Sequence, residues 1–153
     1  MSENKEKRLG FEIKKVSNLI KTRFGEIVQS TYDSKDFPEN YSWILGYLFR
    51  HRDRVVCQKD LEKAFCVGRA TMSKMLTCLE DKGYIERKNV DTDKRLNQIV
   101  LTEKGLKLES KIKESIDNFD NKLLATLSDE EREQMFALLE KLAFALQNTS
   151  TNE

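Results

Sequence analysis

The sequence of 153 residues is poor in the residue types on which most enzyme and metal sites depend. It has one histidine, His51, so a Ser/His/Asp catalytic set has no plausible candidate and no second imidazole stands at metal-ligand spacing. The sequence contains no GxGxxG or other phosphate-binding glycine loop, and its paired carboxylates are scattered over helix surfaces. We therefore predict that the chain is not an enzyme and holds no metal or cofactor.

Cysteines are few, and long apolar runs are absent. Cys57, Cys66 and Cys78 form an odd set without CxxC spacing, which argues against a disulfide framework or a zinc site. No run of eighteen apolar residues and no signal sequence occurs, which predicts a soluble, cytoplasmic protein without a membrane partner. The thiols have two open interpretations, inert reduced cysteines or redox sensors. For the second, Cys57 opens a predicted helix whose dipole favours the thiolate, and Cys78 flanks the outward face of the next helix.

An excess of charge of either sign is also missing, because 27 basic and 26 acidic residues leave a net charge of +1. The distribution is uneven, however. Residues 38–102 carry 12 basic and 9 acidic residues, whereas residues 103–153 carry 7 and 11. A nucleic-acid-binding protein needs positive potential only where phosphates lie, so the middle segment is the candidate. A solvated surface with a chance excess of cations remains the alternative.

Residues 58–82 predict two short helices joined by a tight turn. Each helix has one apolar face at helical spacing, formed by Leu61, Ala64 and Phe65 in the first and by Met72, Met75, Leu76 and Leu79 in the second. The four residues 66–69 leave room only for a sharp corner, and Gly83 ends the second helix.

Strand-forming residues follow Gly83 in two stretches, 84–87 and 98–101. The polar run 89–93 between them suits a turn. Together they predict a two-stranded wing. The fold class is therefore mainly α with a small β wing, a winged helix-turn-helix.

A family pattern runs through this tract. Its parts are Thr-x-Ser/Thr in the second helix, Leu-Glu-x-x-Gly-x-Ile/Val-x-Arg, Asp-x-Arg and Leu-Thr-x-x-Gly, which are met by Thr71 and Ser73, by residues 79–87, by Asp93-Lys94-Arg95 and by residues 101–105. In this order and spacing the tract resembles the MarR (multiple antibiotic resistance regulator) family of bacterial transcription factors. The resemblance implies a homodimeric regulator of double-stranded DNA, more often a repressor than an activator. Such a dimer binds a pseudo-palindrome whose half-sites lie about 10 base pairs apart.

The resemblance also implies a domain organisation. Residues 1–37 are an N-terminal dimerisation helix that Phe37-Pro38 ends, 38–102 are the winged helix-turn-helix lobe, and 103–153 are C-terminal dimerisation helices of the same intertwined unit. A capping box, Ser128 with Glu131, starts the last helix. The apolar stripes are Ile13, Val16, Ile20, Phe24 and Ile27; Leu108, Ile112, Ile116, Phe119 and Leu123; and Met135, Leu138, Leu139, Leu142 and Leu146. We expect these stripes to face a partner chain, with an intramolecular bundle as the alternative.

The second helix, projected from residue 70 to residue 82, turns a small polar face outward. That face can enter the major groove, where Lys74 donates to guanine or a phosphate, Ser73 and Thr77 bond base edges or backbone, and Ala70 touches a thymine methyl. Thr71 lies on the flank of this face, and Arg69 at the helix entrance is placed for a phosphate or a base. A plain solvated surface is the alternative for each residue.

The resemblance assigns further roles to the wing. It implies that Arg95 enters the minor groove and that Lys88 and Lys94 follow phosphates. Asp93 would be repelled by phosphate, so we expect it to fix an arginine or form a loose turn salt bridge. Two positions depart from the family, because Cys66 stands where glycine is common and Gly68 where Ser or Asp caps the helix. The start of the recognition helix is therefore left open.

MarR-like proteins often bind a small aromatic or lipophilic effector between the dimerisation helices and the DNA-binding lobe, which releases the DNA. Trp43, Tyr47 and His51 lie about one turn apart and could line such a pocket, or be core. Two other functions stay open. One is a thiol-redox-sensing regulator, although the family's peroxide sensors carry their cysteine in the first helix, where residues 1–37 have none. The other is a winged-helix module that binds proteins and not DNA.

Overall fold

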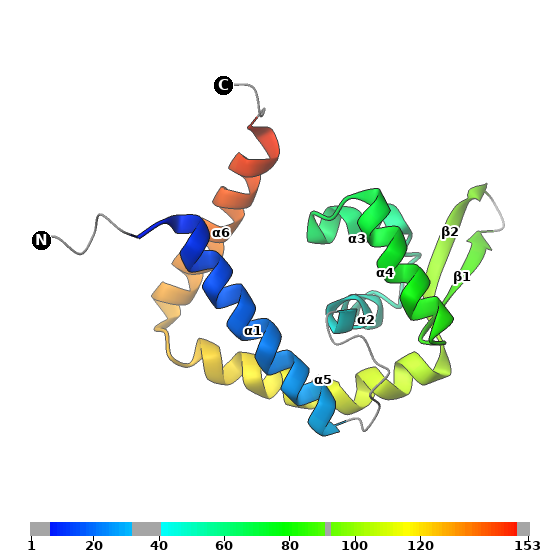
Figure 1. Ribbon diagram of the computed structural model, residues 1–153, viewed down its shortest axis with the longest axis horizontal. Helices are drawn as coiled ribbons and strands as arrows, with labels where there is room; N and C mark the ends of the chain where they lie inside the picture. Colours follow the sequence, from blue (N-terminus) through cyan, green and yellow to red (C-terminus); the bar gives the residue numbers. More distant parts are fainter. Residues whose placement is uncertain (1–6, 32–40, 91–92, 150–153) are drawn as a thin grey trace, which may run out of the picture. The chain divides into compact units, whose positions relative to one another are not determined.

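The computed structural model describes residues 7–31, 41–90 and 93–149. Within these ranges, residues 90 and 93–96 are described by their backbone alone. The described elements are, in chain order, helices α1 (Leu9–Thr31), α2 (Ser42–Arg50), α3 (Gln58–Phe65) and α4 (Arg69–Asp81), strands β1 (Ile85–Val90) and β2 (Asp93–Leu101), and helices α5 (Glu103–Leu124) and α6 (Asp129–Asn148) (Figure 1). The predicted fold class is confirmed. The predicted break at Phe37-Pro38 lies outside the described residues.

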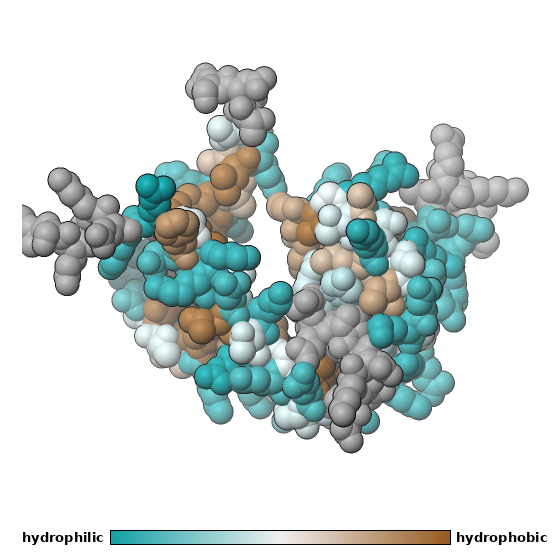
Figure 2. All heavy atoms as spheres, viewed as in Figure 1, coloured by the Kyte–Doolittle hydropathy of each residue, from teal (hydrophilic) through white to brown (hydrophobic). Residues whose placement is uncertain are grey.

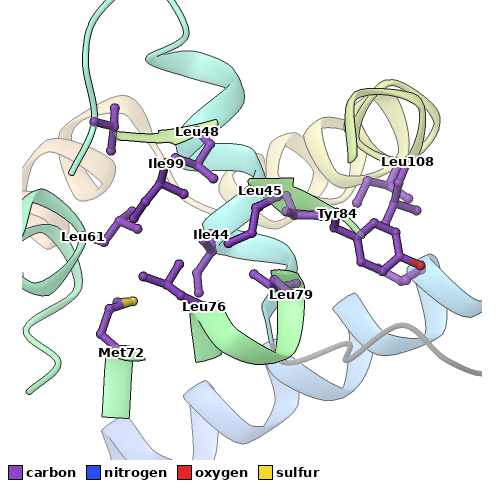
Figure 3. Close-up of a cluster of buried hydrophobic side chains, with 14 residues drawn as sticks. Ile44, Leu45, Leu48, Leu61, Met72, Leu76, Leu79, Tyr84, Ile99 and Leu108 are labelled. Carbon is purple, nitrogen blue, oxygen red and sulfur yellow. The ribbon is translucent and has the colours of Figure 1, made fainter. Parts of the chain in front are cut away.

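The chain forms two compact units, Met1–Ile116 and Asp117–Glu153. The core of the first unit is built around one face of α4, where Met72, Leu76 and Leu79 are fully buried. Leu76 and Leu79 point toward Ile44 and Leu45 of α2 (Figure 3). Because these apolar side chains leave water together, their burial orients α4 and leaves its opposite face outward.

The first half of α5 completes this core and corrects one expectation. Leu108 and Ile112 are fully buried within the core cluster of their own chain, and Ile116 packs against it. These residues therefore face the core of their own winged-helix lobe and neither a partner chain nor a bundle of terminal helices, because α5 starts directly after β2. In α1, burial is confined to Gly25 and Val28, and Ile13 and Val16 are exposed.

The wing is an antiparallel pair whose register runs from Ile85 opposite Leu101 to Asn89 opposite Asn97, with a shift before Val90. Its strands are longer than the predicted stretches 84–87 and 98–101. Backbone pairing therefore continues past the predicted stretches toward the far end of the hairpin. An isolated bridge between Cys57 and Gln98 connects the segment before α3 to β2.

The second unit contains the end of α5 and α6. The predicted capping box is confirmed, because the Glu131 N–H donates to Ser128 Oγ at 3.1 Å and the Ser128 N–H donates to Glu131 Oε2 at 2.8 Å. No residue of α6 is buried. Its exposed apolar side chains include Phe136, Leu138, Leu139, Phe144 and Leu146, and Figure 2 shows brown, hydrophobic atoms on the surface over α6. None of the helices in the described ranges has the length and apolar character needed to cross a bilayer.

Candidate nucleic-acid interface

The corner between α3 and α4 explains the two unusual residues of the turn. Cys66 ends α3 in the left-handed region, with φ 52°, where glycine is favoured because a Cβ is strained there. Gly68 is the N-cap of α4 in an extended conformation, and as a glycine it has no side-chain oxygen with which to cap the helix. The helix therefore begins at Arg69, which settles the position that the sequence left open.

Backbone and side-chain hydrogen bonds hold this corner. The Val67 N–H donates to Glu62 O at 3.1 Å, and the Met72 N–H donates to Gly68 O at 2.9 Å. Gln58 Nε2, from the first turn of α3, donates to Arg69 O at 3.2 Å. This hydrogen bond connects the first turn of α3 to the first turn of α4. It therefore restricts the movement of the N-terminal end of α4 relative to α3.

The outward face of α4 is small and polar, as the sequence predicted. Its exposed residues include Arg69, Ala70, Thr71, Lys74 and Thr77, whereas Ser73 is half-buried at the margin of the face. The acidic residues Glu80 and Asp81 come only at the C-terminal end of the helix. Positive charge therefore gathers at the N-terminal half, where the helix dipole also favours anions.

The wing contacts this helix through an arginine that the sequence analysis did not single out. Arg87 lies two residues after buried Ile85 on β1, so both side chains project from the same face of the sheet. Its Nη2 donates to Thr77 Oγ1 at 3.2 Å, and its Nε lies 3.8 Å from Glu80 Oε2. The period-two alternation from Ile85 could have shown the direction of the side chain, but not the residues it meets.

The other face of the wing carries Lys88, which is exposed and pairs with Glu86 at 3.9 Å. Asp93, Lys94 and Arg95 begin β2 opposite the end of β1, and their side chains lie outside the described part of the structure. The roles assigned to these three residues therefore stay predictions.

An open cavity of about 440 Å³ lies in the first unit between α1, α2 and α4. Its lining includes one face of α1 and the start of α2, with Ser17, Ile20, Lys21, Phe24, Tyr41, Ser42, Trp43 and Met75. Most of these side chains are apolar or aromatic. Lys21 supplies a cation at the wall, so the cavity has the mixed character of a site for a small amphipathic molecule.

The three residues predicted as a pocket do not share one cavity. Trp43 lines the cavity just described, whereas His51 lines a second one of about 200 Å³. Tyr47 packs between them, with its ring centroid 4.3 Å from that of His51 and 5.5 Å from that of Phe65. Phe65 of α3 connects Trp43 to Tyr47, because its ring centroid also lies 4.0 Å from that of Trp43.

The cysteines are all free thiols. Cys57 is half-buried as the N-cap of α3, and its N–H donates to Asp60 Oδ2 at 2.8 Å. Burial and then the charge of Asp60 raise the pKa of the Cys57 thiol. Both effects act against the thiolate that the helix N-terminus was predicted to favour. Cys66 is exposed and Cys78 half-buried, and no set of ligands suited to a metal ion occurs among the residues described.

Comparison with known proteins agrees with this geometry. A sequence model of the MarR family matches residues 51–96. The HTH-type transcriptional regulator BilQ of Clostridium symbiosum is 34% identical over 85 residues, which cover 56% of this chain and 59% of that protein. The chain thus spans about three fifths of the length of that curated relative.

Solved structures match over more of the chain. The transcription regulator MarR from Oenococcus oeni superimposes with a TM-score of 0.78 at 29% identity and covers 89% of this chain and 98% of its own. A complex of Staphylococcus aureus MepR with DNA gives a TM-score of 0.78 at 30% identity, over 92% of this chain and 99% of that one. The chain belongs to the MarR family.

The MarR pattern acquires a physical meaning here, because two of its parts contact each other. Thr102 Oγ1 donates to Gly83 O at 2.5 Å and accepts from the Gly105 N–H at 3.1 Å, so it caps α5 while holding the end of α4. Gly83 has φ 79°, in the region that favours glycine. Lys104 Nζ also donates to Lys82 O at 2.7 Å. Residues of the pattern thus form the hydrogen bonds that connect the end of the recognition helix and the start of the wing to the start of α5.

Proposed function

We propose that this MarR-family chain is a cytoplasmic, sequence-specific DNA-binding regulator that acts as a homodimer, represses transcription and is released by a small ligand. The observation that carries the proposal is the exposed polar face of α4, with Arg69 and Lys74 in its N-terminal half and a β wing beside it. A helix of this kind fits the major groove, where small side chains allow close approach. The similarity to a MepR–DNA complex supports the same docking mode.

In this arrangement α4 reads bases and the surrounding cations fix the register. Arg69 and Lys74 meet phosphates or guanine edges, Ala70 and Thr71 approach base edges, and Ser73 bonds the backbone. Arg95 enters the minor groove from the wing, Lys88 and Lys94 follow phosphates, and Asp93 orients an arginine. The wing and helix each supply part of the contact area, and neither is sufficient alone.

A second copy of the chain supplies the cover that the exposed apolar residues of α1 and α6 require. In α1 the exposed side chains include Leu9, Phe11, Ile13, Val16 and Leu19, at 43–69% of full exposure. In α6 they reach 70% at Phe144 and 77% at Leu146. Apolar faces of this extent mark interaction surfaces in proteins that stay in solution. A symmetric dimer also presents two recognition helices to the two halves of a pseudo-palindrome.

The cavity between α1, α2 and α4 is the site we assign to a small aromatic or lipophilic effector. It touches Met75 of the recognition helix and Ile20 and Phe24 of α1, so a bound molecule acts on the position of α4 relative to α1. Trp43 lines the cavity and is the only tryptophan of the chain, so its fluorescence reports occupancy directly. A Ser17→Phe substitution would fill the cavity, and Asn18→Phe is the matched control on the same helix.

The proposal is tested with purified protein, DNA from upstream of its own gene and scrambled DNA in a fluorescence-anisotropy titration. Tight, salt-sensitive and sequence-selective binding supports a regulator. Binding without salt dependence, or none at all under reducing conditions, would favour a protein-interaction module. An effector from a panel of aromatic compounds must both quench Trp43 and release the DNA, and Ser17→Phe but not Asn18→Phe must abolish both effects.

The thiol-redox alternative is separated in the same assay. If an oxidant releases DNA from the wild type but not from one Cys→Ser variant, oxidation of that cysteine controls DNA release, and binding of a ligand in the cavity does not. Cys66 and Cys78 are the informative positions, because Cys66 is exposed at the corner and Cys78 flanks the outward face of α4. Cys57 has its pKa raised by burial and by Asp60, which lowers the thiolate fraction available for oxidation.

A further inference from the structure

Thr77 of the recognition helix and Arg87 of the wing are joined by a hydrogen bond that also affects which hydrogen bonds the Thr77 hydroxyl can make. Thr77 is exposed on the outward face of α4, and its Oγ1 accepts a hydrogen bond from Arg87 Nη2. The acceptor capacity of the hydroxyl is thus partly used by a cation. A threonine hydroxyl has one proton to donate and two lone pairs, so the remaining question is where that proton goes.

Two threonines of α1 donate their proton within their own helix. Thr22 Oγ1 donates to Asn18 O at 3.0 Å, and Thr31 Oγ1 donates to Ile27 O at 2.7 Å. Within the part of the chain that the structure describes, Thr77 makes no such bond to a carbonyl of α4. Its proton is therefore left for an acceptor outside the protein. The neighbouring guanidinium polarises the O–H bond and strengthens it as a donor.

Glu80 places a carboxylate beside the guanidinium. Its Oε2 lies 3.8 Å from Arg87 Nε, on the turn of α4 that follows Thr77. The side chain of Arg87 is 26% exposed, and its charge is balanced by a carboxylate on the same helix. Arg87 is thus committed to α4 and is poorly placed to neutralise a phosphate.

We propose that Arg87 is a positioning residue that makes Thr77 a hydrogen-bond donor toward DNA, so that Thr77 selects bases with a major-groove acceptor. Guanine offers N7 and O6, adenine N7 and thymine O4, whereas cytosine presents only the N4 amino donor, which cannot accept the Thr77 proton. The inference rests on the proposed function and names the part of the base preference that the wing controls. Arg87 would act through Thr77 and would touch no base itself.

The test starts by selecting the preferred sequence of the wild-type dimer from a random DNA library. Affinities for every single-base variant of that sequence are then measured by anisotropy for wild type, Thr77→Val, Thr77→Ser and Arg87→Met. Thr77→Val keeps the size of the side chain and removes the hydroxyl, and Thr77→Ser keeps the hydroxyl. Arg87→Met keeps an apolar stem over α4 and removes the guanidinium.

We expect Thr77→Val to lose discrimination against cytosine at one position of each half-site, by about five- to tenfold, while Thr77→Ser retains it. Arg87→Met lowers the preference at the same position only, and the double variant loses no more than Thr77→Val. Lys88→Met is the control from the opposite face of the same strand. It weakens binding to all sequences alike and reduces the salt slope by about 1, whereas Arg87→Met leaves the slope unchanged.

Three results would overturn the inference. The first is that Thr77→Val retains every base preference of the wild type, and the second is that Arg87→Met weakens all sequences alike with the Thr77-dependent preference intact. Either result removes the specificity role and leaves the proposed function standing. Failure of the wild type to select any sequence overturns the proposed function and this inference together. Because Thr77 is exposed, Thr77→Val is expected to stay folded. It therefore tests whether the Thr77 hydroxyl selects bases even if a urea titration shows that Arg87→Met is unfolded without denaturant.

Discussion

Gly105 lies so close to the backbone of Tyr84 that a Cβ at position 105 would be 2.2 Å from the Tyr84 carbonyl oxygen. Tyr84 is itself fully buried, and its carbonyl accepts the Thr102 N–H at 3.1 Å. The start of α5 and the start of the wing therefore meet without room for any side chain. Since α4 ends only three residues before Tyr84, at Asp81, this contact also limits the position of the recognition helix.

Gly105→Ala is expected to destabilise the fold by about 1 to 3 kcal/mol, because the backbone must shift to admit one methyl group. The free energy of unfolding from a urea titration measures the effect. Gly10→Ala is the matched control, because nothing lies within 4 Å of a Cβ at that position of α1. We expect Gly10→Ala to change stability by less than about 1 kcal/mol. Equal free energies of unfolding for the two variants would contradict this expectation. They would show that the backbone near Tyr84 moves to admit the methyl group at little cost.

Lys74 is the exposed cation in the middle of the outward face of α4. Lys74→Ala should weaken DNA binding by about 1 to 3 kcal/mol. A salt series of anisotropy titrations separates its two predicted partners, because loss of a phosphate contact lowers the salt slope by about 1 and loss of a guanine contact does not. Lys141→Ala, a substitution at an exposed position of α6, is the control. If both variants bound like wild type, α4 would not be the recognition helix.

Arg95 tests the wing. We predict that Arg95→Ala weakens DNA binding by about 1 to 3 kcal/mol while the dimer stays intact, because a guanidinium is lost from the minor groove. Arg52→Ala serves for comparison, since Arg52 donates to Phe49 O at 2.8 Å and belongs to neither α4 nor the wing. Unchanged affinity of the Arg95 variant in the presence of an intact dimer would remove the wing tip from the mechanism.

Phe144 tests the partner-facing role of α6, where its side chain is 70% exposed. The wild-type chain should sediment as a dimer at micromolar concentration, and Phe144→Glu should sediment as a monomer, because a carboxylate would be buried in the interface. DNA affinity should fall by at least about 100-fold, since two linked half-sites become separate binding events. Phe144→Leu should preserve both properties. A wild-type monomer would mean that the exposed faces are covered within one chain.

Cys57 tests the electrostatics at the N-cap of α3. Burial and Asp60 raise its pKa, so at a given pH the folded protein holds less thiolate there than the unfolded chain does. In a Cys66→Ser, Cys78→Ser background, alkylation of Cys57 should therefore be slower in the folded state than in urea. Its pH–rate profile should also be displaced to higher pH. A profile displaced to lower pH would restore the redox hypothesis for this residue.

Local patterns were enough to predict the helix-turn-helix, because its helices are specified by nearby residues. The stripe of Met72, Leu76 and Leu79 defined the buried face of α4, and Gly83 marked its end. The capping box of α6 was equally local. In each of these cases the residues that determine the structure lie within about two helical turns of one another.

The remaining features depend on residues distant in sequence. Leu108 and Ile112 have the spacing of a partner-facing stripe, but the path of the chain after β2 buries them in its own core. The bond from Arg87 to Thr77 joins positions ten apart across a turn, and no periodicity predicts it. Similarly, the raised pKa of Cys57 follows from burial and from the charge of Asp60, neither of which the helix-dipole argument includes.

The most direct test of the account is equilibrium binding of the reduced, ligand-free protein to its own upstream DNA, measured by fluorescence anisotropy from low to physiological salt with scrambled DNA beside it. A DNA-binding dimer predicts affinity for the upstream DNA at least about 1,000-fold above that for the scrambled DNA, with both affinities falling steeply as salt rises. Equal, weak and salt-insensitive binding to the two DNAs would contradict the account and leave a winged-helix fold whose partner is not nucleic acid.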